Sequence, residues 1–481
     1  MIKHVLGWIL LFEALFLVPP TLISVFCREK SMRGLLISIL ICATVGFLCV
    51  LGKAKNKTLY SKEGFVIVSL SWVILSIFGA IPFFIYFKDA GLPYNFVDAF
   101  FETVSGFTTT GASILLDVEA TPKSLLFWRS FANWIGGMGV LVFIMAFIPL
   151  SGATNMHIMK AESPGPSVSK LVPRVRTTAL ILYTIYFSLT LVQFILLLFG
   201  GMTPFEAICT AFSTAGTGGF GIKNDGFSGF NSYIQIVVTV FMLIFSINFT
   251  SYYLAMKGRI KEAFNTEVRW FLIIVFSAVA LITLNIYTNF ESIGDAIKHA
   301  AFTVASIIST TGFATVDFAQ WSEFAKGILL LLMMIGACAG STGGGIKVSR
   351  ILIFFKSVAR EFRYMLHPKQ VKKVTIDKRP VENETVRTVA VYLICYVILF
   401  IVSYLIISLD PSKLCNFETG FSAVMATINN VGPGLSNVGP SSNFSWLSAP
   451  SKLVLSFDML AGRLELFPML LLFHPATWKK N

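Results

Sequence analysis

Runs of about 20 apolar residues recur along this 481-residue chain, and they constrain its fold more than any other feature. A helix of roughly 20 residues is long enough to cross ~30 Å of hydrocarbon. Charged residues make up only 13% of the chain and hydrophobic residues 55%, which is too little charge to cover a soluble protein of this length. The sequence therefore predicts an all-α polytopic membrane protein and excludes a soluble dehydrogenase.

We predict ten membrane spans, the eighth of which is interrupted by glycines. They are Val5–Phe26, Leu35–Leu51, Gly64–Phe87, Leu125–Ile148, Ala179–Leu198, Ile234–Met256, Trp270–Tyr287, Gly327–Lys356, Ala390–Leu409 and Leu453–Phe473. Glu13 and the pair Pro19–Pro20 interrupt the first span, and no small-residue cleavage site follows it. We therefore expect a retained helix rather than a signal peptide.

Basic residues gather in alternate loops, which the positive-inside rule places in the cytoplasm. The opposite loops carry acidic residues and few cations. The basic segment Arg28–Arg33 is an exception, because this topology puts it outside. The net charge of +13 is thus interpreted as topogenic, and no nucleic-acid partner is expected.

Four predicted outer loops share one pattern, a short apolar stretch followed by a cluster of Thr, Ser or Asn with Gly. The clusters align on Gly111, Gly218, Gly312 and Gly432, which subtraction of their numbers places 107, 94 and 120 residues apart. A span precedes and follows each copy, so we predict four non-identical repeats of helix, pore loop and helix around one pore. The predicted units are an N-terminal two-helix hairpin, 1–52, and repeats 53–152, 153–262, 263–379 and 380–481.

The apolar stretches of these loops are about ten to fifteen residues long, too short to cross a bilayer. Irregular backbone at membrane depth is tolerated only where it lines a protein-walled or watery cavity. Glycine lets the backbone turn successive carbonyls the same way, so four such loops around one axis could replace the hydration shell of a cation. An acidic residue near the start of each stretch suits the positive end of a helix dipole. These residues are Asp98, Glu206, Asp295 and Glu418.

The second loop also contains the dinucleotide-binding spacing G-x-G-x-x-G at Gly216, Gly218 and Gly221. That fingerprint binds a pyrophosphate only between a strand and a helix of a βαβ unit. Here it follows a predicted half-helix, so we interpret the match as chance and expect no bound organic cofactor.

The loop motifs resemble those of the superfamily of Trk, Ktr and plant high-affinity potassium transporters, and the resemblance covers essentially the whole chain. The N-terminal hairpin favours the TrkH branch, the membrane subunits of bacterial Trk systems, over the KtrB branch. The motifs are GFTTTGAS (106–113), NWIGGMGV (133–140), STAGTGGF (213–220), STTGFAT (309–315), GSTGGGIK (340–347), NNVGPGL (429–435) and AGRLELF (461–467).

The resemblance implies a potassium selectivity filter in segments 109–113, 216–220, 310–314 and 430–434. In the plant relatives a serine at the first aligned position goes with sodium permeation, so the glycine at position 111 points to potassium. The second and fourth loops depart from Thr-Thr-Gly, which leaves the exact selectivity open. The implied potassium-binding residues are Thr109, Thr110, Gly111, Gly216, Thr217, Gly218, Thr310, Thr311, Gly312, Asn430, Val431 and Gly432.

The glycine-rich segment Met333–Arg350 interrupts the eighth span, and it lacks the G-K-[ST] of a phosphate loop. Glycine costs about 1 kcal/mol relative to alanine in a helix, so the segment is either a packing kink or a flexible intramembrane loop. The resemblance implies the second reading, a gating loop at 336–347 below the filter. The implied gate residues are Gly340, Gly343, Gly344, Gly345 and Arg463.

Several polar residues lie inside predicted spans, where an ionisable group is costly. Arg463 and Glu465 are two apart on a helix and point away from each other, so we expect no ion pair between them. Arg463 either faces the pore, as the resemblance implies, or anchors its helix. For Arg129, Asn133 and Asn248 we favour a role in bracing helices and the filter.

No nucleophile, metal or acid–base cluster appears in the sequence, so we expect a transporter and not an enzyme, and a receptor or scaffold would not need four such loops. Two alternatives remain open, a proton- or sodium-coupled potassium symporter and a KtrB-like sodium-dependent transporter. The long basic segments 159–176 and 350–379 suit anionic lipid. The resemblance further implies a multi-pass protein of the bacterial inner membrane, a homodimer, and a cytosolic TrkA-like ring that binds NAD or ATP.

Overall fold

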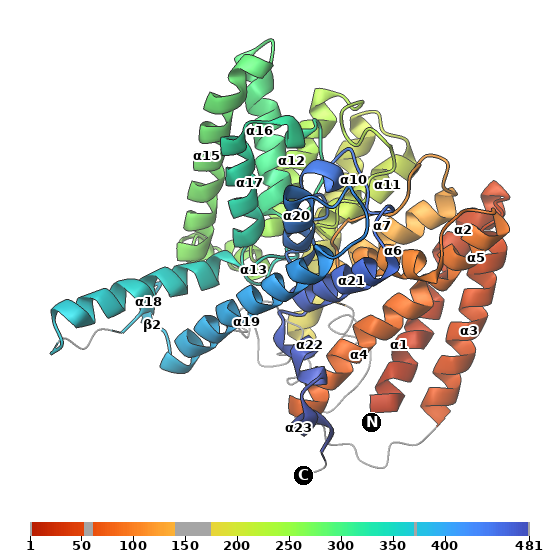
Figure 1. Ribbon diagram of the computed structural model, residues 1–481, viewed down its shortest axis with the longest axis horizontal. Coiled ribbons are helices and arrows are strands. Elements are labelled where there is room, and N and C mark those ends of the chain that lie inside the picture. The colour runs from red at the N-terminus through yellow and green to blue at the C-terminus, as the bar shows by residue number, and fades with distance from the viewer. Residues whose placement is uncertain (1, 52–60, 140–174, 370–372, 480–481) are drawn as a thin grey trace.

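The computed structural model describes residues 2–51, 61–139, 175–369 and 373–479. These residues are mostly helical. They also contain one short antiparallel hairpin of β1 (Thr375–Ile376) and β2 (Arg379–Pro380), in which Thr375 pairs with Pro380. Figure 1 shows helices packed on helices, with α18 (Val348–Leu366) and α19 (Asn383–Ile407) extending away from the body on one side.

Six stretches of the described chain are long and apolar enough to cross a membrane, and they match the first, second, third, fifth, seventh and ninth predicted spans. Prolines at the starts of α2 and α5 divide the first and third of them into two helices each. The stretches are α1 (Ile2–Phe16) with α2 (Val18–Cys27), α3 (Met32–Leu51), α4 (Ser61–Gly79) with α5 (Ile81–Asp89), α10 (Val175–Phe199), α15 (Thr266–Ile286) with the 3₁₀ turn η1 (Tyr287–Asn289), and α19.

The predicted sixth span is not a single helix. It is divided into α12 (Ser232–Ser246) and α13 (Phe249–Met256), which are bent by 92°. At the break, Ser246 O accepts from Cys338 N at 3.1 Å, and Phe249 N donates to Gly340 O at 3.0 Å. The backbone groups freed by the bend therefore bind another chain segment, which is what makes a break tolerable at membrane depth.

The eighth span is interrupted as predicted, between α17 (Glu323–Ile335) and α18. The tenth is also broken, into α21 (Ala449–Arg463) and α22 (Phe467–Leu472), because Glu465 and Leu466 adopt φ angles of 57° and 65°. Of the fourth span, α7 covers Lys123–Gly137 and the rest lies outside the described residues.

Four short helices follow the third, fifth, seventh and ninth predicted spans, and each ends in a loop inside the molecule. The side chains in their last turns are buried, whereas large apolar side chains such as Phe187, Phe276 and Ile398 are exposed on the outer spans. Exposed apolar surface of this kind fits a lipid environment. The short helices are α6 (Phe96–Phe107), α11 (Pro204–Ala215), α16 (Ile293–Ile308) and α20 (Phe417–Ile428), and the remaining elements are α14 (Ile260–Ala263), η2 (Phe318–Gln320), η3 (Ser436–Val438) and α23 (Pro475–Trp478).

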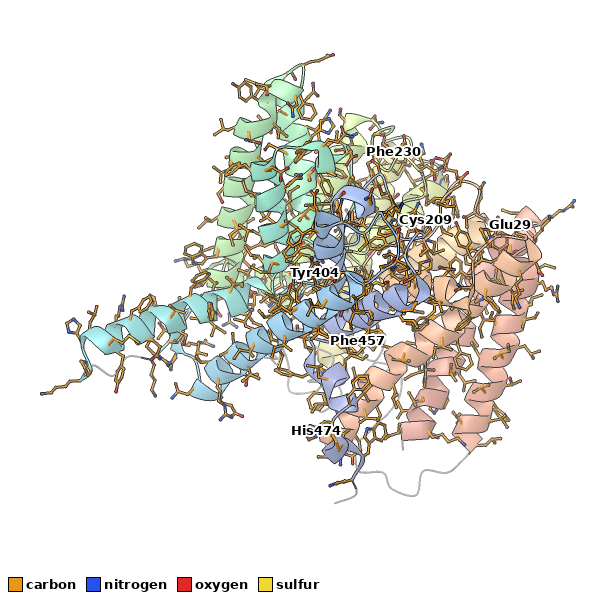
Figure 2. All side chains as sticks on the ribbon, in the orientation of Figure 1. Glu29, Cys209, Phe230, Tyr404, Phe457 and His474 are labelled. Atoms are coloured by element: carbon orange, nitrogen blue, oxygen red, sulfur yellow. The ribbon has the colours of Figure 1, made fainter. Side chains whose placement is uncertain are left out.

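The N-terminal hairpin packs against α4 and α5 and is tied to the first repeat through the loop between α2 and α3. Glu29, labelled in Figure 2, accepts hydrogen bonds from the backbone N–H groups of Lys123 (2.8 Å) and Ser124 (3.1 Å) at the start of α7. Arg33 pairs with Asp89 at 3.2 Å. The basic loop Arg28–Arg33 thus lies on the same side as the start of α7, the side that the predicted topology places outside.

Candidate ion pathway

Each short helix begins with a side-chain cap that holds its start. Asn95, Thr203, Ser292 and Asn416 accept a hydrogen bond from a backbone N–H in the first turn, and an acidic residue follows within that turn. This confirms the predicted placement of the four acidic residues. Every one has a lysine partner: Asp98–Lys452 at 2.5 Å, Glu206–Lys223 at 3.9 Å, Asp295–Lys298 at 3.1 Å and Glu418–Lys326 at 3.0 Å.

The four helices end in loops with one backbone conformation. The second residue after each helix has a left-handed φ between 54° and 59°, and a glycine two residues later has a φ between 66° and 96°. Between them lies a residue whose N–H donates to the carbonyl five residues earlier, at 2.8 to 2.9 Å. The equivalent triplets are Thr109-Thr110-Gly111, Thr217-Gly218-Gly219, Thr310-Thr311-Gly312 and Asn430-Val431-Gly432.

These triplets correct the predicted alignment of the second loop by one residue. The sequence match paired Gly218 with Gly111, but Gly219 has the positive φ of 66°, and Gly218 takes the place of Thr110. Gly216 caps α11 with a right-handed φ of −70° and lies outside the triplet. The second segment is therefore 217–221 rather than 216–220. Several glycines in a row satisfy the sequence pattern equally well, and only the backbone dihedrals distinguish them.

The four triplets form a closed ring. A Cβ built on each triplet glycine would come within 3.0 Å of a carbonyl oxygen in another triplet. Gly111 lies against Gly218 O and Gly219 against Thr311 O. Gly312 lies against Val431 O and Gly432 against Thr110 O, which completes the cycle. Four backbone segments with their carbonyls thus meet around one axis.

Of the three predicted bracing residues, Arg129 and Asn133 lie beside the first two triplets, and Asn248 lies at the start of α13. Arg129 forms a buried ion pair with Glu102 (2.7 Å), which also accepts from the Ile114 N–H at 2.9 Å beside the first triplet. The same guanidinium lies 4.0 Å from the ring centroid of Phe220, just after the second triplet. The amide of Asn133 donates to Ser213 at 3.4 Å, while Asn248 caps α13 through a 2.8 Å bond from the Thr250 N–H.

The outer loops of the first two repeats are joined through Asn224. Its side chain donates to Asp117 at 2.8 Å and accepts from the backbone N–H of Val118 at 2.8 Å. The hydrogen bond from Asn224 lowers the pKa of Asp117 below its ordinary value. Asp117 therefore keeps its negative charge at the side of the molecule where the short helices begin.

Segment 336–347 lies against the ring on the side where the short helices end. The Gly344 N–H donates to the Thr310 hydroxyl at 2.6 Å, and the Gly345 N–H donates to Asn429 O at 3.1 Å. Residues 337–339 and 341–344 are buried or nearly so. The segment is thus a folded loop bonded to the third triplet and to the residue just before the fourth, and not a kinked helix.

Arg463 joins this loop to the first repeat. One guanidinium nitrogen donates to Thr342 O at 2.7 Å, and the other to Gly136 O at 2.6 Å and Gly137 O at 2.5 Å. Glu465 is paired with Arg350 on α18. The guanidinium of Arg463 therefore lies at segment 336–347 and donates to three carbonyl oxygens.

Comparisons with known proteins agree over nearly the full length. The family described as "TrkH: Cation transport protein" matches residues 28–480. The Trk system potassium uptake protein TrkH of Escherichia coli K12 is 35% identical, with 100% of this chain and 99% of that protein covered. The crystal structure of the potassium transporter TrkH from Vibrio parahaemolyticus superposes with a TM-score of 0.89 at 32% identity and covers 99% of both chains.

The chain belongs to the TrkH family of cation transport proteins.

As a member of the TrkH family it is a multi-pass transport protein of the bacterial inner membrane, and it is not an enzyme. The TrkG protein of the same Escherichia coli strain is a further relative, 32% identical over 99% of this chain and 98% of its own.

Three charged residues in or beside the loop were not singled out from the sequence as site residues. The Lys347 ammonium donates to Gly343 O within the loop, and Arg350 pairs with Glu465 while lying over the Tyr392 ring, 4.1 Å from its centroid. Glu267 accepts from the Ala339 N–H at 2.7 Å. Charged residues at the ends of apolar spans could have indicated these positions in the sequence. Basic residues at span ends are also expected from the positive-inside rule, so they did not stand out.

Proposed function

We propose that this TrkH-family chain takes up potassium through the ring of four triplets. The closed cycle of carbonyl contacts carries the proposal, because oxygens from four segments around one axis can replace the hydration shell of a cation. The names of its relatives, which are potassium uptake proteins, support potassium as that cation. The proposed coordinating residues are Thr109, Thr110, Gly111, Thr217, Gly218, Gly219, Thr310, Thr311, Gly312, Asn430, Val431 and Gly432.

Segment 336–347 is the gate in this proposal. Its contacts with Thr310 and Asn429 support a position across the pathway directly below the ring. The nearby charge of Arg463 adds an electrostatic barrier, since a cation in a low-dielectric passage feels a fixed positive charge more strongly than in water. Opening then requires movement of the loop and of this guanidinium away from the axis.

We also propose that a cytosolic ring of nucleotide-binding subunits controls this gate and that the chain works as a homodimer. Support for the cytosolic partner comes from the basic residues that continue the loop along α18, among them Lys356, Arg360 and Arg363. A partner docked there would act on the helix into which the gating loop leads. Nucleotide chemistry would belong to the partner.

The test is the reversal potential of the purified chain in liposomes under opposed potassium and sodium gradients, at two values of pH. A passive potassium pore gives a reversal potential set by the potassium gradient alone. A dependence on pH or on the sodium gradient would instead establish the coupled alternatives. Equal permeability to potassium and sodium would overturn the proposed selectivity.

A further inference from the structure

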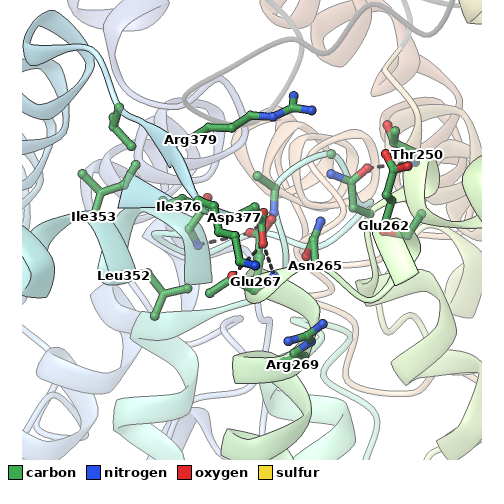
Figure 3. Close-up of a pocket in the computed structure, with 18 of the residues that line it drawn as sticks. Thr250, Glu262, Asn265, Glu267, Arg269, Leu352, Ile353, Ile376, Asp377 and Arg379 are labelled. Atoms are coloured by element: carbon green, nitrogen blue, oxygen red, sulfur yellow. Dashed lines mark hydrogen bonds between the residues drawn. The ribbon is translucent and has the colours of Figure 1, made fainter. Parts of the chain in front are cut away.

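A cavity of about 1220 Å³ lies next to the gating loop on the side that the charge pattern assigns to the cytoplasm (Figure 3). It is enclosed by α13, α14, the start of α15, the loop itself, α18 and the β1–β2 hairpin. Ala339 and Gly340 of the loop line it, and so do Glu267 and Asp377. The β1–β2 hairpin and the gating loop therefore line the same cavity.

Glu267 connects α15 to both ends of the gating region. Its Oε1 atom accepts from the Ala339 N–H at 2.7 Å and from the Ser349 N–H at 3.1 Å. Ala339 lies within the loop, and Ser349 lies in the first turn of α18, just after it. The residue is 8% exposed, so water competes little for these two charge-assisted bonds. One carboxylate thus holds the loop and the helix that follows it.

The residue before Glu267 is held by the hairpin. Asp377 Oδ1 accepts from the Thr266 N–H at 2.8 Å and from the Thr266 hydroxyl at 2.6 Å. Asp377 and Lys378 form the hairpin turn with φ angles of 49° and 62°. Lys356 of α18 donates to Thr375 O at 2.8 Å. The hairpin turn is therefore connected to the loop through α15: Asp377 bonds to Thr266, and the next residue, Glu267, bonds to Ala339.

Glu262 offers a contrast within the same cavity. It pairs with Arg259 at 2.6 Å, three residues away, and both side chains are about half exposed. No hydrogen bond recorded among the described residues joins Glu262 to the loop. Glu262 is thus an acidic residue that lines the same cavity and has no hydrogen bond to the loop among the described residues.

We propose that Glu267 is a positioning residue that holds loop 336–347 closed, and that the Asp377 turn is the lever through which a cytosolic partner releases it. The inference rests on the proposed function, namely that the loop is the barrier to potassium. Displacing the hairpin would shift Thr266, and Glu267 would withdraw its acceptor from the Ala339 N–H.

The experiment measures potassium flux per folded molecule and single-channel open probability for the full chain in liposomes without any partner. Glu267→Ala should raise the open probability roughly tenfold, as expected when a charge-assisted hydrogen bond is lost from the closed state alone. Glu267→Gln keeps an acceptor oxygen and should restore most of the closure. Glu262→Ala is the matched control and should leave the flux at the parent level.

Two readouts separate positioning from a general structural role. The potassium-to-sodium permeability ratio should stay unchanged in Glu267→Ala, because the ring is untouched. Asp377→Ala should raise the open probability as well, and the double variant should add little to the single ones, since both act on the same contact. A folded Glu267→Ala protein with parental or lower open probability, or with altered selectivity, overturns the inference.

Deleting 340–345 separates this failure from failure of the proposed function. If the deletion raises flux and Glu267→Ala does not, the loop remains the barrier and the role of Glu267 is wrong. If neither raises flux, the gate itself is refuted, and the inference with it. Should Glu267→Ala not fold, Asp377→Ala decides: a raised open probability with unchanged selectivity supports the inference, and a parental open probability overturns it.

Discussion

Gly111 and Gly219 have φ angles of 83° and 66°, and a side chain on either would overlap a carbonyl oxygen of the neighbouring triplet. Gly111→Ser or Gly219→Ser should therefore weaken discrimination of potassium from sodium, because one quarter of the carbonyl ring is displaced. The measurement is the permeability ratio from reversal potentials.

Gly201 provides the control for these serine variants. Its φ is 91°, but a Cβ added there would have no neighbour within 4 Å. Gly201→Ser thus carries the same kind of backbone strain, about 1–2 kcal/mol, without contact with the ring. A similar loss of selectivity in Gly201→Ser would show that the effect comes from strain, and would contradict the role of the ring.

Arg463 combines a positive charge with three carbonyl contacts, and two substitutions distinguish these roles. Arg463→Gln should raise potassium flux per folded molecule, because it removes the charge from a low-dielectric passage. Arg463→Lys keeps the charge but loses the planar fork that reaches several carbonyls at once. If flux rises only in Arg463→Gln, the charge of Arg463 is the barrier. If flux rises in both variants, the carbonyl contacts of Arg463 hold the loop closed. Unchanged flux in both variants, at normal expression, would refute both roles.

At the scale of elements, the breaks in α12–α13 and α17–α18 depend on each other. The loop after α17 supplies hydrogen-bonding partners to the bend after α12, and it also donates to Thr310 of the third triplet and to Asn429, just before the fourth. Because so many of its backbone groups are paired, the loop has a defined conformation. Moving it exchanges several hydrogen bonds at once, which suits a gate with two discrete positions.

Deleting Gly340–Gly345 should accordingly raise basal potassium flux and reduce its dependence on any cytosolic partner. The triplets remain intact in this variant, so the permeability ratio should change little. Flux of a folded deletion variant is compared with the parent in the same liposomes. Parental flux would mean that the barrier lies elsewhere.

At the scale of the whole molecule, four loops far apart in the chain contribute carbonyls to one ring, so a cation bound there would link distant parts of the chain. Ligand that binds only the folded state stabilises it by mass action, by about 2.7 kcal/mol at 100 times the dissociation constant. We expect a higher melting temperature in potassium chloride than in choline chloride at equal ionic strength. Gly111→Ser should reduce that difference, and an equal melting temperature in both salts would argue against a potassium site in the ring.

The sequence by itself determined the membrane class and most of the long helices, because only uninterrupted apolar runs can satisfy their backbone in lipid. It also indicated where the short helices begin, since Asp98, Glu206, Asp295 and Glu418 each lie in a first turn, where an acidic side chain suits the helix dipole. The interruption of the eighth span followed from its glycines. These features depend on residues close together in the chain.

Tertiary structure decided what depends on contacts between distant residues. The sequence does not distinguish Gly218 from Gly219, because both are glycine. Only the fold gives Gly219 the positive φ and places it against Thr311 O of the next triplet. Apolar composition from Ile234 to Met256 permitted a straight helix, but hydrogen bonds from the gating loop stabilise a bend of 92°. Glu267 lies at the end of a span, where charged residues are common, so the sequence did not single it out. The fold brings its carboxylate to the Ala339 N–H, 72 residues later in the chain.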